Sequence, residues 1–312
     1  MPKLPPYATK FNGVNSSSTP FHFLYLSFSM KKEKTVNLNG TYYSAGNLIS
    51  TGNRAFLYGD SVFESIRYDG EILLWSQHYA RLLRAAAAMG FVFSPWWTED
   101  YFRYEIKKTL RQNKYESARV RLILFREEET MGYAPSVDRC SYLIDVDELD
   151  GHAYTQQSQG LRIGVFEDAK KYPGPFSFFK SGQSLLYVLA SRKARNEAWD
   201  EILILNEHNR ICESSTGNVW VVKDHKILTP PVEENGISGI MRDHLLKRLP
   251  ELGMEVRESK LSPEDLHLSD EIWISNAVRG VRWVAEWDFR KYKSEIATQI
   301  QKLLQEESIH HD

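Results

Sequence analysis

Alternation of apolar and polar residues predicts several strands in the first half of the chain. Residues 119–125 alternate arginine with valine and leucine, which is typical of a strand with one buried face. Residues 61–68 and 140–146 form similar runs. Residues 34–48 alternate around an Asn-Leu-Asn-Gly run at 37–40, and this predicts a hairpin because Asn-Gly favours the tight turn between two strands.

Helical spacing follows the first strands. Leu82, Leu83 and Ala86 recur at positions that share one helix face, which predicts a helix capped by Ser76, running through Met89 and closed by Gly90. A second helix is predicted at about 98–113.

The second half of the chain mixes both periodicities. Strands are predicted at 161–166, 201–205, 218–222, 254–258 and 271–275, and helices at 182–198, 240–252 and near 292–306. Ser262 followed by Pro263 predicts the start of a further short helix. The order is mixed rather than strictly alternating, which favours two α+β domains over a Rossmann fold or a barrel.

A polar stretch divides the two halves. Residues 149–160 are rich in Gly, Gln and Ser and form the best candidate for a domain linker. We therefore expect a small N-terminal α/β domain at 30–148 and a larger C-terminal domain at 161–312. Residues 1–29 contain no acidic residue and are rich in Pro, Ser and Asn, so we expect a disordered extension or an upstream mis-start.

Composition narrows the class of function. The chain has 312 residues, 42% hydrophobic residues and a formal net charge of −2, which gives no electrostatic footprint for nucleic acid or an anionic membrane. The two cysteines, Cys140 and Cys212, form no disulfide framework and favour a cytoplasmic location. The histidines show no metal-ligand spacing, and no P-loop or nucleophile elbow is present.

One amine and one carboxylate stand out as candidate chemistry. Lys180 follows Phe178-Phe179 and precedes a helical run, and Glu213 begins a polar turn that leads into a strand. A pyridoxal phosphate enzyme needs such a pair: a lysine for the Schiff base and an acid for the pyridine nitrogen. An isolated lysine is most often a solvated surface charge, so the pair alone is weak support.

Two segments and one arginine have the chemistry of an anion site. Residues 236–242, Gly-Ile-Ser-Gly-Ile-Met-Arg, open a predicted helix, and free backbone N–H groups at a helix start bind phosphate. Residues 275–280 place small and polar groups after a strand, although an ordinary turn has the same composition. Arg81 lies on the helix beside Leu82 and would clamp a phosphate if its side chain points inward.

Together these segments resemble the class IV, or fold type IV, pyridoxal phosphate enzymes. That family includes branched-chain and D-amino acid aminotransferases and 4-amino-4-deoxychorismate lyases. The similar stretches run in family order from about residue 35 to residue 288, and they lie at residues 58–67, 78–82, 179–181, 213–220, 228–230, 236–242 and 270–284.

The resemblance implies a two-domain fold with pyridoxal 5'-phosphate at the domain interface and a homodimer. It implies that Lys180 binds the cofactor and moves the substrate's α-proton, and that Glu213 pairs with the pyridine nitrogen. It implies that Arg81 and the backbone amides of Ile240 and Met241 hold the phosphate, with Ala277 nearby.

Departures from the commonest family pattern leave the substrate open. Met241 stands where a hydroxyl residue is often found. Leu185 stands where branched-chain aminotransferases typically have tyrosine, and Met131 stands where many lyases have arginine. The leading hypothesis is an aminotransferase acting on a small amino acid, branched-chain or similar, and a 2-oxo acid. The alternatives are the lyase that makes 4-aminobenzoate and pyruvate, and a non-catalytic binding module on the same fold.

Overall fold

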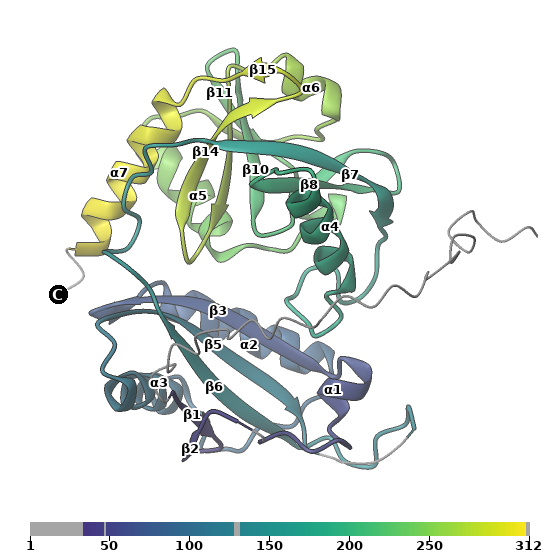
Figure 1. Cartoon of the computed structure of the whole chain (residues 1–312), viewed down its shortest axis with the longest axis vertical. Coiled ribbons are helices and arrows are strands. Elements are labelled where there is room, and N and C mark those ends of the chain that lie inside the picture. Colours follow the sequence, from purple (N-terminus) through teal and green to yellow (C-terminus); the bar gives the residue numbers. More distant parts are fainter. Residues whose placement is uncertain (1–33, 47, 128–131, 310–312) are drawn as a thin grey trace, which may run out of the picture. The chain divides into compact units, whose positions relative to one another are not determined.

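The computed structural model describes residues 34–309, except for residues 47 and 128–131. The extension expected at residues 1–29 lies outside the described residues. Met131, one of the departures from the commonest family pattern, also lies outside them. Lys34 to the C-terminal helix forms one compact unit built on two β-sheets (Figure 1). None of the helices in this described part is long and apolar enough to cross a membrane.

The first sheet is antiparallel, with strand order β2-β1-β6-β5-β3-β4. Its strands are β1 (Thr35–Leu38), β2 (Thr41–Ser44), β3 (Ser61–Asp69), β4 (Glu71–Ile72), β5 (Ser117–Arg126) and β6 (Cys140–Glu148). Helices α1 (Arg54–Tyr58), α2 (Trp75–Ala88) and α3 (Glu99–Asn113) belong to this half of the chain. The predicted hairpin is present: Asn39 and Gly40 take the positive φ angles that join β1 to β2.

The two faces of this sheet have different roles, as the alternation along β5 predicts. Val120, Leu122 and Leu124 are fully buried in a core shared with α2 and α3. Arg119 and Arg121, on the opposite face, are exposed and line the cavity described below. One face of the sheet therefore makes the core, and the other is free to contact a ligand.

The second sheet is mixed, with strand order β12-β11-β10-β13-β14-β7-β8-β9 and β15 paired to β14. Its strands are β7 (Leu161–Lys171), β8 (Glu201–Asn206), β9 (Ile211–Ser214), β10 (Asn218–Lys223), β11 (Lys226–Thr229), β12 (Val256–Glu258), β13 (Glu271–Asn276), β14 (Gly280–Trp287) and β15 (Arg290–Lys291). The other elements are α4 (Leu185–Asn196), η2 (Val232–Glu234), α5 (Ile240–Glu251), α6 (Pro263–His267) and α7 (Glu295–Ile309).

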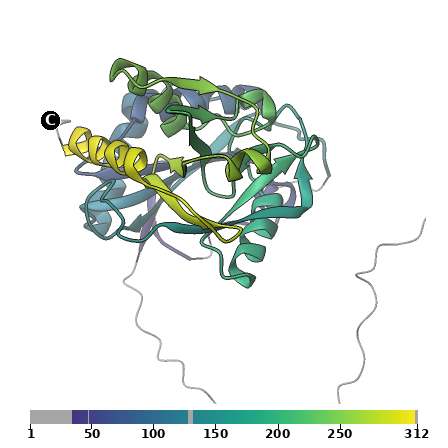
Figure 2. The ribbon, with the colours of Figure 1, turned by 90° about the horizontal axis from the view of Figure 1, so that it is seen from above.

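Helices cover the second sheet, so its central strands are apolar on both faces. Trp220 of β10 packs with α5 and α7, whereas Val219 and Val221 of the same strand face a separate core. Helix α7 lies beside the second sheet in both views (Figures 1 and 2). Trp220 stacks on Trp273 of β13 with ring centroids 4.8 Å apart. The mixed α+β class is therefore confirmed.

Residues 149–160 join the sheets and are bonded to both. Arg67 of β3 donates to the carbonyl oxygen of Gly151 at 2.8 Å, and the Ala153 amide donates to Asp69 at 2.6 Å. On the other side, the Tyr154 hydroxyl donates to the carbonyl oxygen of Ala277 at 2.9 Å. The buried side chain of Tyr154 packs into the second core, so this segment contacts both halves of the chain.

Two predicted helix starts are wrong. Helix α2 begins at Trp75 after Leu74, which has a left-handed φ of 54°, and Ser76 donates its hydroxyl to Glu99 instead of capping the helix. Burial of Leu73 and Trp75 sets this start. Helix α4 begins at Leu185 rather than 182, because the preceding residues pair with β3. Strands β9 and β14 were not predicted.

The tryptophan stack should dominate the stability of the second sheet. Trp273→Ala removes a fully buried side chain and should lower the free energy of unfolding by about 3–5 kcal/mol. Trp96→Ala is the control, since Trp96 is 80% exposed and its loss should cost about 0.5 kcal/mol or less. Chemical denaturation of both variants measures the difference. Equal costs would contradict this placement of the core.

Candidate active site

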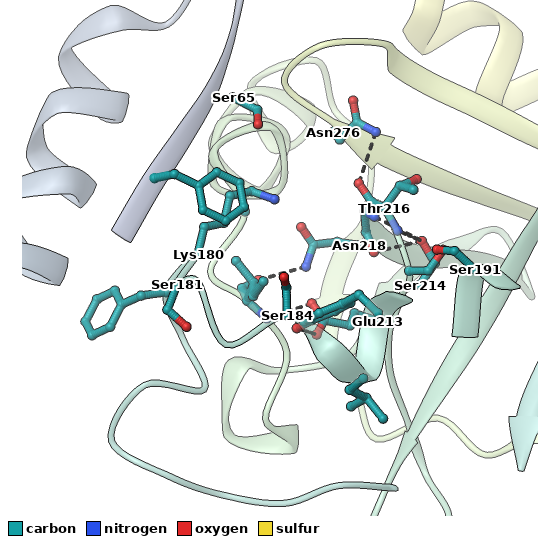
Figure 3. A pocket seen from close by; sticks show the side chains of 18 of the residues that line it. Ser65, Lys180, Ser181, Ser184, Ser191, Glu213, Ser214, Thr216, Asn218 and Asn276 are labelled. Atoms are coloured by element: carbon teal, nitrogen blue, oxygen red, sulfur yellow. Dashed lines mark hydrogen bonds between the residues drawn. The ribbon is translucent and has the colours of Figure 1, made fainter. Parts of the chain in front are cut away.

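A cavity of about 1280 Å³ collects polar groups from both sheets. Its walls include the outer face of β3 and β5, the segment before α4, the β9–β10 turn, the start of α5 and the β13–β14 turn. Figure 3 shows Lys180, Glu213, Asn218 and Asn276 arranged around this space. Small ligands bind preferentially in such concave sites with a few convergent polar groups.

Main-chain pairing with β3 fixes the position of Lys180. The Phe63 amide donates to the carbonyl oxygen of Lys180 at 2.9 Å, and the Gly182 amide donates to the carbonyl oxygen of Ser61 at 2.9 Å. A Cβ at Gly182 would lie 2.5 Å from the Ser61 hydroxyl and 2.9 Å from the Gly59 carbonyl oxygen, so only glycine fits there. The lysine is therefore held by a short strand-like contact rather than by a helix.

The environment of Lys180 favours its neutral, nucleophilic form. Its amine lies 5.6 Å from the centre of the Phe63 ring. Burial, followed by the positive charge of Arg81, lowers the pKa of Lys180 to about 8, while Glu64 and Glu213 act in the opposite direction. At pH 7 about a tenth of the amine is then unprotonated, against less than a thousandth for an ordinary lysine, and the neutral amine is the form that a covalent catalyst uses.

Arg81 points inward and is held by a buried carboxylate. Its Nε and Nη2 donate to the two oxygens of Glu64 at 2.8 and 2.5 Å, and its Nη1 donates to the Ser238 carbonyl oxygen at 2.7 Å. His78 contacts the same carboxylate at 2.7 Å. Although burial acts to raise the pKa of Glu64, Arg81 and His78 outweigh it and hold that pKa at about 2.

Arg81 keeps capacity for a ligand. A guanidinium has five N–H donors, and three are directed to Glu64 and Ser238. One N–H on each terminal nitrogen has no partner among the residues that the structure describes. Arg81 lines the cavity, so these two donors suit an anion there.

The start of helix α5 adds backbone donors to the same wall. Gly239 occupies the N-cap position and has no side chain to cap the helix. Asn218 donates to the Ile237 carbonyl oxygen at 2.9 Å, and a Cβ at Gly239 would lie 1.9 Å from the Asn218 side chain. Because no side chain caps the helix, the first backbone amides of α5 are available to bind an anion.

Glu213 lies in strand β9 and is buried at the opposite side of the site. Its Oε1 accepts hydrogen bonds from Lys171 Nζ at 2.5 Å and from the Tyr187 hydroxyl at 2.6 Å. Its Oε2 accepts from the Ile237 amide at 2.9 Å. The carboxylate is therefore oriented by three hydrogen bonds and adjacent to the cavity.

The β13–β14 turn closes the last side. Asn276 accepts from the amides of Val278 and Arg279, and it donates to the Thr216 carbonyl oxygen at 3.1 Å. Ala277 lines the cavity, and its carbonyl oxygen is fixed by Tyr154. The turn is thus tied to the loop that follows Glu213.

The structure brings most of the sequence-predicted residues together. Lys180, Glu213, Arg81, Ile240 and Ala277 line one cavity. Met241 is not among the residues that line it, and its side chain is buried in the core with α7. Sequence reasoning missed Glu64, Lys171 and Tyr187. Glu64 lies within the predicted strand 61–68. An acidic residue on the apolar face of that strand was the sequence feature that could have identified it.

Comparison with known proteins agrees with this geometry. The model of the family described as "Amino-transferase class IV" matches residues 61–287. The chain belongs to the class IV aminotransferase family. It is therefore an enzyme of a pyridoxal phosphate-dependent family rather than a binding module.

Relatives within the family carry two activities. The chain is 30% identical to the branched-chain-amino-acid aminotransferase of Salmonella typhimurium over 76% of this chain and 79% of that protein. It is 27% identical to the aminodeoxychorismate lyase of Vibrio harveyi over 75% and 85%. The structure of the Escherichia coli branched-chain aminotransferase superposes with a TM-score of 0.80 and 26% identity, covering 88% of this chain and 94% of that one.

Leu185 is one of the positions at which the resemblance leaves the substrate of this class IV aminotransferase open. That side chain is 68% exposed at the start of α4, and Leu185 is absent from the described residues that line the cavity. Tyr187, two residues further along α4, supplies the hydroxyl that donates to Glu213. A tyrosine hydroxyl is thus present in the site, but it comes from position 187 instead of 185 and contacts Glu213.

The lowered pKa of Lys180 predicts a distinctive pH dependence. Because only the neutral amine reacts, acetylation of Lys180 in the cofactor-free protein should rise through a midpoint near pH 8. Labelling of Lys302 in the same sample is the comparison, because its side chain is 73% exposed. Competitive labelling with peptide mass spectrometry measures both. Identical profiles would show that Lys180 is solvated.

Proposed function

We propose that the protein is a pyridoxal phosphate-dependent aminotransferase that moves an amino group between a small amino acid, branched-chain or similar, and a 2-oxo acid. The observation that carries the proposal is the convergence of Lys180, Glu213, Arg81 and the start of α5 on one cavity. The similarity to branched-chain aminotransferases supports the substrate class.

The groups present fit the cofactor. Arg81 has two unused N–H donors beside the uncapped start of α5, which suits a phosphate. Glu213 presents a buried carboxylate, which suits a protonated ring nitrogen. Lys180 lies between these two anchors, with electrostatic contributions to its pKa from both Arg81 and Glu213.

The residues divide the work in the following way. The bound cofactor supplies an electron-withdrawing ring that stabilises negative charge at the substrate α-carbon. Lys180 takes the proton from that carbon and returns one, which its lowered pKa permits near neutral pH. Glu213 keeps the ring nitrogen protonated, and Arg81 with the amides of Ile240 and Met241 holds the phosphate. Ala277 lies beside that phosphate in this arrangement.

The alternative activity is that of 4-amino-4-deoxychorismate lyase. The similarity to the Vibrio harveyi lyase favours it, as does the placement of Leu185 outside the cavity. Both activities use Lys180 for proton transfer, and they differ in what leaves the substrate afterwards.

We also propose a cytoplasmic homodimer with domains at 30–148 and 161–312 joined by 149–160. The two free, buried cysteines support a reducing location. An apolar row on α4, formed by Leu185, Val188 and Leu189, is exposed and supports self-association. Light scattering of the purified protein tests the dimer.

An absorbance titration tests the function. The purified, cofactor-loaded protein is mixed with L- and D-amino acids and with aminodeoxychorismate, and the visible cofactor band is followed. Loss of the band with branched-chain amino acids, and transfer of the amino group to a 2-oxo acid, is the expected result. Release of 4-aminobenzoate would establish the lyase, and no response to any compound would reject both activities.

Replacing Arg81 should weaken cofactor binding. Arg81→Ala removes the charged partner of the phosphate and should cost roughly 2–4 kcal/mol, which is a roughly 30- to 1000-fold higher Kd. Arg81→Lys should recover only part of this, since it lacks the planar fork. Equilibrium dialysis measures the Kd, with circular dichroism as a check of folding. Parental affinity in Arg81→Ala would reject the phosphate assignment.

Replacing Glu213 should impair turnover more than binding. In Glu213→Gln the neutral amide cannot stabilise a protonated ring nitrogen, so the turnover rate should fall by about ten- to a hundredfold. The cofactor should stay bound through its phosphate. Steady-state kinetics and a cofactor titration separate the two effects, and unchanged turnover would mean that another residue faces the ring.

A further inference from the structure

The carboxylate of Glu213 is held from behind by two side chains that the proposed mechanism does not use. Lys171 of β7 and Tyr187 of α4 both donate to Oε1, at 2.5 and 2.6 Å. The side chains of Lys171 and Glu213 are only 9% and 3% exposed. Buried charges in proteins are normally paired in this way, so the contact is a built part of the site.

Lys171 also connects Glu213 to the segment that carries Lys180. Its amine donates to the Tyr187 hydroxyl at 2.7 Å and to the Ser177 carbonyl oxygen at 3.2 Å. A lysine ammonium has three N–H donors, so this one is fully used. Ser177 lies three residues before Lys180 in the chain, and one amine therefore fixes both sides of the cavity.

The charges of this group nearly cancel. Lys171 contributes one positive charge and Glu213 one negative charge, and burial raises the pKa of Tyr187 so that its hydroxyl stays neutral. The remaining oxygen, Oε2, accepts from Ile237, which lines the cavity. A cation that approaches Oε2 from the cavity therefore meets a carboxylate that is already neutralised on its other side.

We propose that Lys171 and Tyr187 are positioning residues for Glu213. They fix Oε1 so that Oε2 serves the cofactor's ring nitrogen, and the charge of Lys171 limits how tightly Glu213 holds the proton on that nitrogen. The proposal rests on the function given above, in which Glu213 faces the ring. Under this proposal the pKa of the protonated ring nitrogen depends on Lys171, a residue that does not contact the reacting atoms.

Charge variants of Lys171 test the electrostatic part. The holoenzyme is loaded with cofactor labelled with ¹⁵N in the ring, and its nitrogen resonance is followed against pH. In Lys171→Met the midpoint at which the ring proton is released should rise by about one pH unit or more, because the competing cation is gone. Lys171→Arg keeps the charge and should stay near the parent. Lys170→Met, the adjacent residue, is the matched control.

Tyr187→Phe tests the positioning part in a variant that keeps its shape and charge. Loss of one hydrogen bond to Glu213 should slow single-turnover amino transfer by about three- to tenfold. The cofactor Kd should stay within error of the parent, whereas the thermal midpoint of the cofactor-free protein should fall, because one N–H of the buried Lys171 amine also loses its acceptor. Tyr104→Phe, on the exposed face of α3, is the control and should leave all three values unchanged.

The possible outcomes separate this proposal from the proposed function. An unchanged ¹⁵N midpoint in Lys171→Met together with parental rates in Tyr187→Phe would overturn it. If Glu213→Gln also leaves the ¹⁵N titration of the ring unchanged, Glu213 does not face the ring, and that part of the proposed function fails first. A shifted midpoint in Lys171→Met that Lys171→Arg restores would support the proposal.

Discussion

The buried ion pair between Glu64 and Arg81 is the constraint on which the site depends. Glu64 stands on the core face of β3, and its two oxygens hold Arg81 in one orientation. The third contact of Arg81 reaches Ser238, in the loop that opens α5. A charge so deeply buried is stable only when fully paired, so the pair fixes the loop, the arginine and the strand together.

The same strand sets the position of Lys180. The main chain of β3 pairs with residues 180–182, and Glu64 of the same strand binds Arg81. One strand of the first sheet therefore positions both Lys180 and Arg81. Glu213 comes from the second sheet and is oriented by Lys171 and Tyr187. Arg81 and Glu213 thus place a guanidinium and a carboxylate on the walls of one cavity.

Local sequence signals explain the parts of this structure that were predictable. Alternation along 119–125, the Asn39-Gly40 turn and the Ser262 cap each act within a few residues, and each is present. Ser76 was a wrong cap because burial of Trp75 moved the helix start. Lys171 and Glu213 are 42 residues apart in the chain, so no local sequence pattern predicts their contact. Five of the six predicted site residues line one cavity, and their roles stay predictions.

Identification of the lysine that holds the cofactor is the most direct test of the central claim. Borohydride reduction of the cofactor-loaded protein, followed by digestion and mass spectrometry, fixes the cofactor to the lysine that carries it. The account predicts a single labelled peptide containing Lys180 and no label in the Lys180→Ala variant. A label on Lys171, or on any other lysine of the parent protein, would contradict the account.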